Sequence, residues 1–304
     1  MSSSNRVAIL TKLHRVLKKH YKPTAPRGDQ PVLETLLFAC CLENTPHVVA
    51  ERVFQSVRSS FFDWNEVRVT TVKELAEVMS DLPNAAAAAT NLKSVLQHTF
   101  ESEYSFELET VKKKNLGDAI KRLQKLEGAS PFVVAYATQV ALSGHSIPID
   151  RGALGVLYVV GAITEAEQAA GSVPGMERAI PKNKGVEFGS LLHELAAEFV
   201  ANPFSTQLRE FLLTIAPDAK DRFPKRTPKK PVAEPVPPAP PKVESKTAKK
   251  AIEPPPSSSK KKEAPPVKKT TAPSKPAPAA KKKSAPQPAK KKTVAKALAK
   301  RKPR

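Results

Sequence analysis

The chain has 304 residues and a formal net charge of +21 at pH 7, and the whole excess lies in one segment. Residues 224–304 carry 25 Lys and Arg against four Asp and Glu, which leaves 25 residues of each sign in residues 1–223. No apolar run reaches the length of a membrane-spanning helix or resembles a signal peptide, so we expect neither a membrane protein nor a secreted one.

Apolar side chains recur at helical spacing along nearly all of residues 1–223, and no stretch alternates as a strand does. These stripes predict helices near residues 7–17, 33–40, 49–57, 84–100, 116–126, 132–142, 188–199 and 208–212. Thr71 with Glu74, and Thr164 with Glu167, fit capping boxes, which predict two more helix starts. The expected class is all-α, with about ten short helices.

The two cysteines, Cys40 and Cys41, are neighbours in the apolar run LLFACCL. Adjacent side chains of a helix point about 100° apart, which argues against a mutual disulfide and against a shared metal site. We therefore expect two buried core thiols, as suits a reducing compartment.

Residues 116–143 predict two helices joined by a very tight turn. Gly128 is suited to ending the first helix, because glycine adopts positive φ without strain. Ser130 and Pro131 are suited to the N-cap and first turn of the second helix. The free amide groups at that helix start can hold a phosphate, or the turn can be an ordinary connection between helices.

Asp150 follows the loop SGHSIP and precedes the apolar segment ALGVLYVVGAI, which predicts another helix. An Asp at this position is typical of an N-cap, and nothing in its spacing alone requires more.

This arrangement resembles the helix-hairpin-helix DNA glycosylases, the HhH-GPD superfamily typified by endonuclease III. The family pattern, Leu-Pro-Gly-Val-Gly-Arg-Lys-Thr-Ala continuing to Val-Asp, spans the same number of residues as Leu126 to Asp150, without a gap. The likeness runs from about Pro31 to Pro217. It implies a two-lobed helical domain over residues 1–223, with Gly128 as the first hairpin glycine and Asp150 as the catalytic acid in a cleft between the lobes.

Three departures change what the resemblance implies. Phe132 stands at the family's catalytic Lys, and a phenyl ring forms no Schiff base, so we expect no lyase activity. Ser130 stands at the second hairpin glycine, and Pro131, which has no amide hydrogen, stands at the following Arg. No Cys follows the last helices, so we expect no iron-sulfur cluster and no metal.

The resemblance also implies which residues meet DNA. Gly128, Ala129 and Ser130 would contact the sugar-phosphate chain at the hairpin. Asn44 is the ungapped match to the side chain that fills the gap left by a flipped base, and Glu43 matches with a shift of one residue.

Three further residues would line the cleft. His145 can contact DNA from the loop before Asp150, although a lone loop histidine is commonly just exposed. Phe132 and Tyr136 lie one helical turn apart and are pocket candidates, although aromatic residues at helical spacing are also typical of a core.

The tail, residues 224–304, contains no Phe, Tyr or Trp and consists mainly of Lys, Pro, Ala and Ser. It cannot bury enough apolar surface to offset the entropy of ordering, so we expect a disordered basic segment. Spaced lysine clusters suit nonspecific binding to phosphate backbones. A solvated spacer, or a segment that binds RNA, anionic lipid or an acidic protein, is the alternative.

Two functions follow from these features, and an unrelated helical scaffold is the remaining alternative. One is a base-excision-repair enzyme, a monofunctional DNA N-glycosylase in which Asp150 serves the loss of a damaged or mispaired base. The other is a catalytically inactive glycosylase-like protein that binds or compacts DNA. For both we expect a monomer that binds double-stranded DNA, in the cytoplasm with the nucleoid or, in a eukaryote, in the nucleus.

Overall fold

The structure of the protein is a computed structural model that describes residues 3–25 and 27–225. These residues contain thirteen α-helices, two 3-10 helices and no strand, so the predicted all-α class is confirmed. The chain divides after Pro231 into two units, and every described residue lies in the first. Nearly all of the expected basic tail lies outside the described residues, and its disorder stays a prediction.

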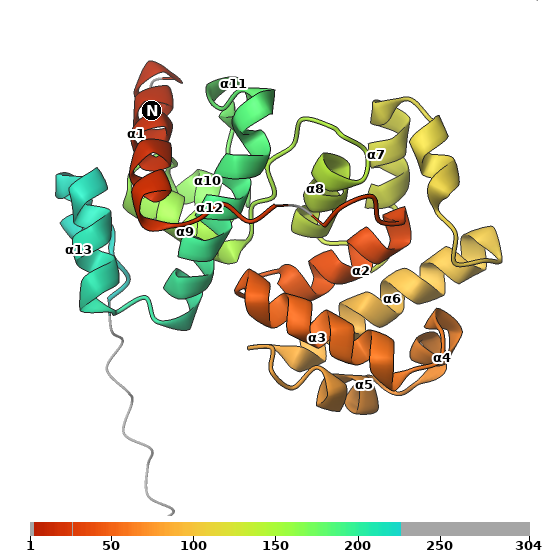
Figure 1. Cartoon of the computed structure of the whole chain (residues 1–304). Helices are drawn as coiled ribbons and strands as arrows, with labels where there is room; N and C mark the ends of the chain where they lie inside the picture. The colour runs from red at the N-terminus through yellow and green to blue at the C-terminus, as the bar shows by residue number, and fades with distance from the viewer. Residues whose placement is uncertain (1–2, 26, 226–304) are drawn as a thin grey trace, which may run out of the picture. The chain divides into compact units, whose positions relative to one another are not determined.

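The first unit has two lobes, each with its own hydrophobic core. Lobe 1 is continuous in sequence and forms the orange to yellow-green part of Figure 1. Its helices are α2 (Val32–Leu42), α3 (His47–Ser60), α4 (Trp64–Val69), α5 (Val72–Val78), α6 (Ala85–Glu103), η1 (Glu109–Lys113), α7 (Leu116–Gln124) and α8 (Pro131–Val140).

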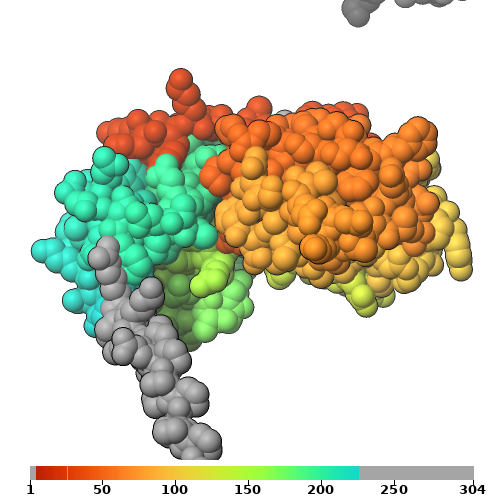
Figure 2. Space-filling view, turned by 90° about the horizontal axis from the view of Figure 1, so that it is seen from below, coloured from red at the N-terminus to blue at the C-terminus, as the bar shows by residue number. Residues whose placement is uncertain are grey.

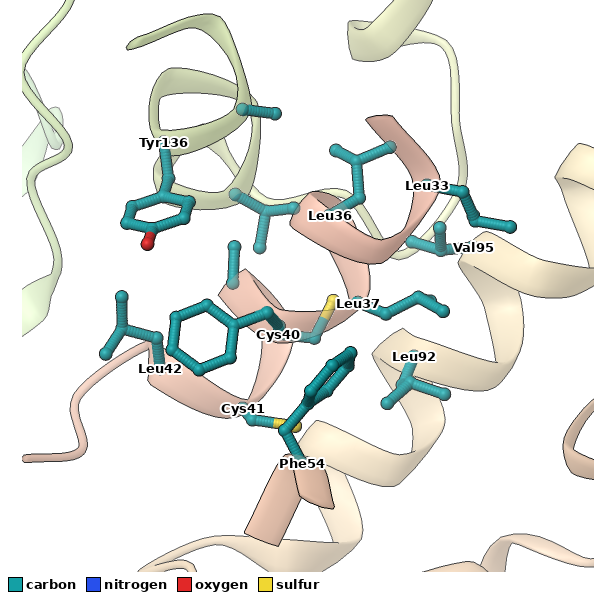
Figure 3. Packing of buried hydrophobic residues seen from close by; sticks show 14 of the residues in the cluster. Leu33, Leu36, Leu37, Cys40, Cys41, Leu42, Phe54, Leu92, Val95 and Tyr136 are labelled. Carbon is teal, nitrogen blue, oxygen red and sulfur yellow. The ribbon is translucent and has the colours of Figure 1, made fainter. Parts of the chain in front are cut away.

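Helix α2 is the centre of lobe 1, and all of its residues except Glu34 are buried. Figure 3 shows it between α8, which carries Tyr136, and α6, which carries Leu92 and Val95. Cys40 and Cys41 are buried and free within this core, as predicted. A helix apolar on every side needs neighbours all round, and α3, α6 and α8 supply them.

Lobe 2 consists of the first helix of the chain and all the helices after Asp150. Leu10, Leu13 and Leu17 of the first helix are fully buried in the core of lobe 2, far from it in sequence. The chain then crosses between the lobes, as the red trace of Figure 1 shows. The helices of lobe 2 are α1 (Ser3–His20), α9 (Arg151–Val159), α10 (Glu165–Ala169), α11 (Met176–Ala179), α12 (Lys182–Ala201), α13 (Thr206–Ile215) and η2 (Pro217–Arg222).

Helices α9 and α12 pack closely because α9 carries glycine where the two backbones meet. A Cβ atom on Gly152 would lie only 2.4 Å from the carbonyl oxygen of Ala196. Gly155 similarly faces the ring of Phe199. This close packing fixes the start of α9, and with it Asp150, against the middle of α12.

Side-chain caps define the helix starts much as the sequence predicts. Both expected capping boxes are present, at Thr71 with Glu74 and at Thr164 with Glu167. Ser130 caps α8, with Pro131 as its first residue. Gly128 has a φ of 83°, in the left-handed region that glycine tolerates.

No helix within the described residues is long and apolar enough to cross a membrane. Figure 2 shows the two lobes as adjoining masses, blue-green and orange, that meet along a seam. The residues singled out from the sequence lie on both sides of this seam.

Candidate functional site

Asp150 lies at the start of α9, on the lobe 2 side of the seam. Its Oδ1 accepts a hydrogen bond of 2.8 Å from the amide of Ala153, which is N-cap geometry. The predicted capping role is therefore present.

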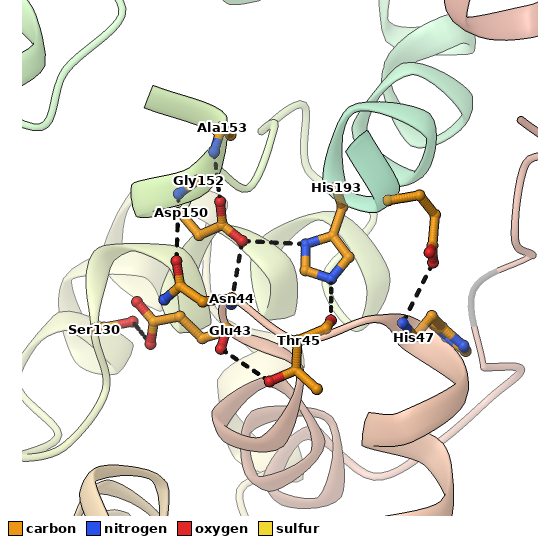
Figure 4. Close-up of polar contacts among 10 residues, drawn as sticks. Glu43, Asn44, Thr45, His47, Ser130, Asp150, Gly152, Ala153 and His193 are labelled. Carbon is orange, nitrogen blue, oxygen red and sulfur yellow. Dashed lines mark hydrogen bonds and ion pairs between the residues drawn. The ribbon is translucent and has the colours of Figure 1, made fainter. Parts of the chain in front are cut away.

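The loop between α2 and α3 supplies the second contact to this carboxylate. The amide of Asn44 donates to Asp150 Oδ2 at 3.2 Å. In return the amide of Gly152 donates to Asn44 Oδ1 at 3.3 Å. Figure 4 shows the side chain of Asn44 directed at the start of α9. The candidate for filling a gap in DNA thus bonds to lobe 2 in this structure.

The third partner of Asp150 is His193 of α12, a residue that no sequence motif indicates. Its Nδ1 lies 3.3 Å from Asp150 Oδ2, and its Nε2 lies 2.7 Å from the carbonyl oxygen of Thr45. Both ring nitrogens lie near acceptors, which favours the imidazolium form; the Nδ1 contact is an ion pair by distance and not a well-directed hydrogen bond. The only signal in the sequence is a polar residue on the apolar stripe of residues 188–199.

Burial and pairing act against each other on these two groups. Burial alone would lower the pKa of His193, but the carboxylate of Asp150 and the Thr45 carbonyl outweigh it and raise that pKa. Burial would likewise raise the pKa of Asp150, but His193 and the amides of Ala153 and Asn44 hold it below its usual value. Asp150 and His193 therefore each favour the charged form of the other, and together they make a buried ion pair.

The expected opening of Asp150 onto a cleft is not found. The residue is only 2% exposed, and both carboxylate oxygens have partners. A carboxylate enclosed in this way, with its charge matched by an imidazolium, cannot touch a sugar without rearrangement of the loop.

Phe132 and Tyr136 line a small pocket between the lobes, together with His47, Gln139 and His193. Its volume of about 40 Å³ admits a few water molecules, each of which needs roughly 10–15 Å³. The ring of Phe132 lies 5.7 Å from that of His193 and 6.3 Å from that of Tyr136. Asp150 does not line this pocket.

The hairpin before α8 has its own acidic neighbour. The hydroxyl of Ser130 donates to Glu43 Oε2 at 2.9 Å while it accepts from the amide of Val133 at 3.2 Å. Burial raises the pKa of Glu43, and the nearby Asp150 carboxylate adds to that rise. Ala129 closes the turn by donating to the carbonyl of Leu126.

A larger polar pocket lies on lobe 1 beside this hairpin. It measures about 220 Å³ and is lined by Glu43, Asn44 and Thr45 on one side and by Asn84 and Asn91 of the α6 region on the other. The hairpin touches the same wall, because a Cβ atom on Gly128 would lie 2.3 Å from the carbonyl oxygen of Asn91. The structure thus brings Asn44, the hairpin and the start of α6 together on one surface.

His145 lies apart from this group. Its Nε2 is 2.8 Å from the carbonyl oxygen of Glu177, and its ring faces Gly185 near the start of α12. Gly185 precedes His193 by eight residues, about 12 Å along the helix. Within the described residues, no group of His, Cys, Asp and Glu is arranged to hold a metal ion.

The fold is similar to that of solved DNA glycosylases. A trapped endonuclease III–DNA covalent intermediate, an estranged-adenine complex, matches 74% of this chain and all of its own at 13% identity and a TM-score of 0.52. A non-covalent endonuclease III–DNA complex matches 73% of this chain and 99% of its own at 16% identity and a TM-score of 0.51. A thermostable thymine-DNA glycosylase matches 64% of this chain and 88% of its own, at 14% identity and a TM-score of 0.46.

Comparison of the sequence with models of protein families finds no match, and neither does comparison with curated protein sequences. At this level of identity the similarity to solved structures concerns the fold. The two-lobed helical fold of the helix-hairpin-helix DNA glycosylases, which the resemblance implied, is confirmed.

Proposed function

We propose that this chain is a DNA-binding protein built on the DNA glycosylase fold, which binds duplex DNA without excising a base. The contact surface comprises the loop Glu43–Thr45, the hairpin Gly128–Ser130 and the start of α6. The observation that carries the proposal is the burial of Asp150, whose carboxylate is held by His193 and two backbone amides.

Base excision needs a carboxylate whose negative charge faces the sugar as the base leaves. Here the charge of Asp150 faces an imidazolium at 3.3 Å. Phe132 stands beside that imidazolium and offers no amine for a Schiff base. Neither simple base release nor combined release and strand cleavage is therefore supported by the chemistry of these groups.

The second candidate is a monofunctional DNA N-glycosylase, and one observation favours it. Interactions with His193 and two amides hold the pKa of Asp150 low despite its burial, so this residue is ionised at neutral pH, as the reaction requires. For that function the loop Glu43–Thr45 would have to leave the start of α9 and uncover the carboxylate. Base release by the intact protein distinguishes the two candidates.

The basic tail supplies the second part of the proposed function. Residues 224–304 carry 25 of the 50 Lys and Arg, and residues 1–223 are electrically balanced. Long-range attraction to DNA therefore originates in the tail, which acts as a nonspecific tether and raises the local concentration of DNA around the folded domain. We propose a monomer without an iron-sulfur cluster or other cofactor, located with the nucleoid or in a nucleus.

Removal of residues 226–304 is expected to weaken duplex binding and to flatten its dependence on salt. Each phosphate contact contributes about −0.9 to the slope of log binding constant against log salt concentration. Losing several contacts therefore makes the slope less steep by several units. Fluorescence anisotropy with a labelled duplex at a series of salt concentrations measures both quantities. An unchanged slope contradicts the tether, and complete loss of binding by the shortened chain contradicts the proposed surface on lobe 1.

A further inference from the structure

We propose that His193 is a positioning residue that, through Asp150, holds the loop Glu43–Thr45 in the conformation that meets DNA. The inference rests on the proposed DNA binding and adds to it a single group that controls the loop. His193 itself lies behind the loop and is only 7% exposed, so it acts on DNA through its neighbours.

Three hydrogen bonds join this loop to lobe 2, and one ion pair lies within lobe 2 beside them (Figure 4). The hydrogen bonds are those from Asn44 to Asp150, from Gly152 to Asn44 and from His193 to Thr45, and the ion pair joins His193 to Asp150. Every member of the set involves Asp150 or His193 directly, except the bond from Gly152, which lies two residues after Asp150. The ion pair is therefore the point on which the loop contacts converge.

The backbone of the loop needs such support. Asn44 has a φ of 60°, a left-handed conformation that costs most L-residues about 1–2 kcal/mol and that asparagine tolerates better than most. This conformation directs the amide of Asn44 at Asp150 and its side-chain oxygen at Gly152. Without the carboxylate as acceptor, nothing else among the described residues bonds that amide.

The surroundings of His193 favour its protonated form. Asp150 faces it from the start of α9, with Glu43 near that carboxylate on the loop, and Glu194 follows it on α12. His47 of α3 lies nearby, and burial lowers its pKa, so it does not oppose that charge at neutral pH. Helix α8 places the apolar ring of Phe132 beside His193, and its uncharged residues Tyr136 and Gln139 line the same pocket.

Loss of the proton from His193 breaks this arrangement. A neutral imidazole has one N–H group, so it can donate either to Thr45 or to Asp150 but not to both. Loss of the Thr45 contact leaves that buried carbonyl without its donor, and loss of the Asp150 contact leaves the carboxylate with its two amide donors but without its cation; either loss is unfavourable enough to shift the loop. The conformation of the loop is therefore coupled to the titration of a single buried side chain.

The test compares the affinity of the full chain for a duplex with one abasic site and for the intact duplex. Their ratio isolates the loop, because the tail binds both duplexes alike. The wild type is expected to prefer the abasic duplex by about tenfold near pH 6, which is the effect of one hydrogen bond to a charged group. This preference should be lost as pH rises through the raised pKa of His193. His193→Gln should show little preference and no pH dependence.

His20→Gln, on the exposed end of α1, is the matched control and should keep the wild-type profile. The imidazole proton signals of His193, followed by NMR in the wild type, should titrate with the same midpoint as the preference, which tests the proposal even where His193→Gln folds poorly. A preference that is absent, independent of pH or unchanged in a folded His193→Gln protein overturns the positioning role. Failure to bind either duplex would instead overturn the proposed DNA binding.

Discussion

Asp150→Asn is expected to lower the free energy of unfolding by about 3 kcal/mol at neutral pH, the usual effect of removing one partner of a buried ion pair. Asparagine caps a helix as well as aspartate does, so the amide of Ala153 keeps its acceptor. What is lost is the negative charge beside the His193 imidazolium, which is then buried without a counter-ion. Urea unfolding measures the change in the free energy of unfolding, provided that its dependence on urea concentration (the m-value) is the same in both proteins.

The double variant Asp150→Asn with His193→Gln provides the control. Removing both charges should destabilise the protein less than the sum of the two single changes, because neither charge is then left alone. A loss below about 0.5 kcal/mol for Asp150→Asn, the range of an ordinary surface substitution, contradicts the buried pair.

The pair also predicts how stability depends on pH. The pKa of His193 is raised in the folded protein, so its contribution is complete below the unfolded value of about 6.5 and is lost as pH rises through the raised value. The pKa of Asp150 is lowered, so its contribution is present above about 3.9 and is lost as pH falls through the lowered value. The difference in stability between the wild type and the double variant should therefore be largest between these two limits.

Gly128→Ala is expected to destabilise the protein by about 3 kcal/mol for two separate reasons. A left-handed φ of 83° costs an alanine about 1–2 kcal/mol. The new Cβ atom would also lie 2.3 Å from the carbonyl oxygen of Asn91, a backbone atom of α6 that cannot move alone. Overpacking of this kind typically costs about 1–3 kcal/mol more.

Gly171→Ala separates the two contributions. Gly171 has a φ of 63° and no atom within 4 Å of where its Cβ would lie, so only the backbone strain remains. Thermal and urea unfolding of the two variants should differ by the cost of the contact with Asn91. Equal losses of unfolding free energy in the two variants would mean that the hairpin at Gly128 is not in close contact with α6.

Much of the fold follows from patterns that are local in the sequence. The stripe Leu10, Leu13 and Leu17 predicts a helix, and Ser130 with Pro131 predicts the start of another, because periodicity and capping act within a few residues. The same stripe does not reveal its partner, which is a core formed by residues after Asp150. Which lobe a helix joins is decided by packing across the whole chain.

At the site, too, the local features are predictable from sequence and the long-range contacts are not. Asp150 as an N-cap is predictable, because its acceptor role concerns the next three residues. Its burial is not predictable, because it depends on Asn44 and His193, 106 residues before and 43 residues after it. A polar residue on an apolar stripe, such as His193, indicates a buried partner, and sequence alone does not say which acid that partner is.

The two candidates at the early loop also separate in the structure. Asn44 bonds to the start of α9, whereas Glu43 bonds to Ser130 of the hairpin. Adjacent residues thus tie the loop to lobe 2 and to the hairpin of lobe 1, respectively. Which of them meets DNA stays a prediction.

Single-turnover base release by the intact protein tests the role of Asp150 most directly. The substrates are duplexes carrying uracil, alkylated, deaminated or oxidised bases, with enzyme in excess and separation of the freed base. If the carboxylate is committed to His193 and the loop, the protein binds these duplexes and releases no base from any of them. Release that is lost in a folded Asp150→Asn protein would show that the carboxylate reaches the sugar, and the chain would then be a DNA N-glycosylase.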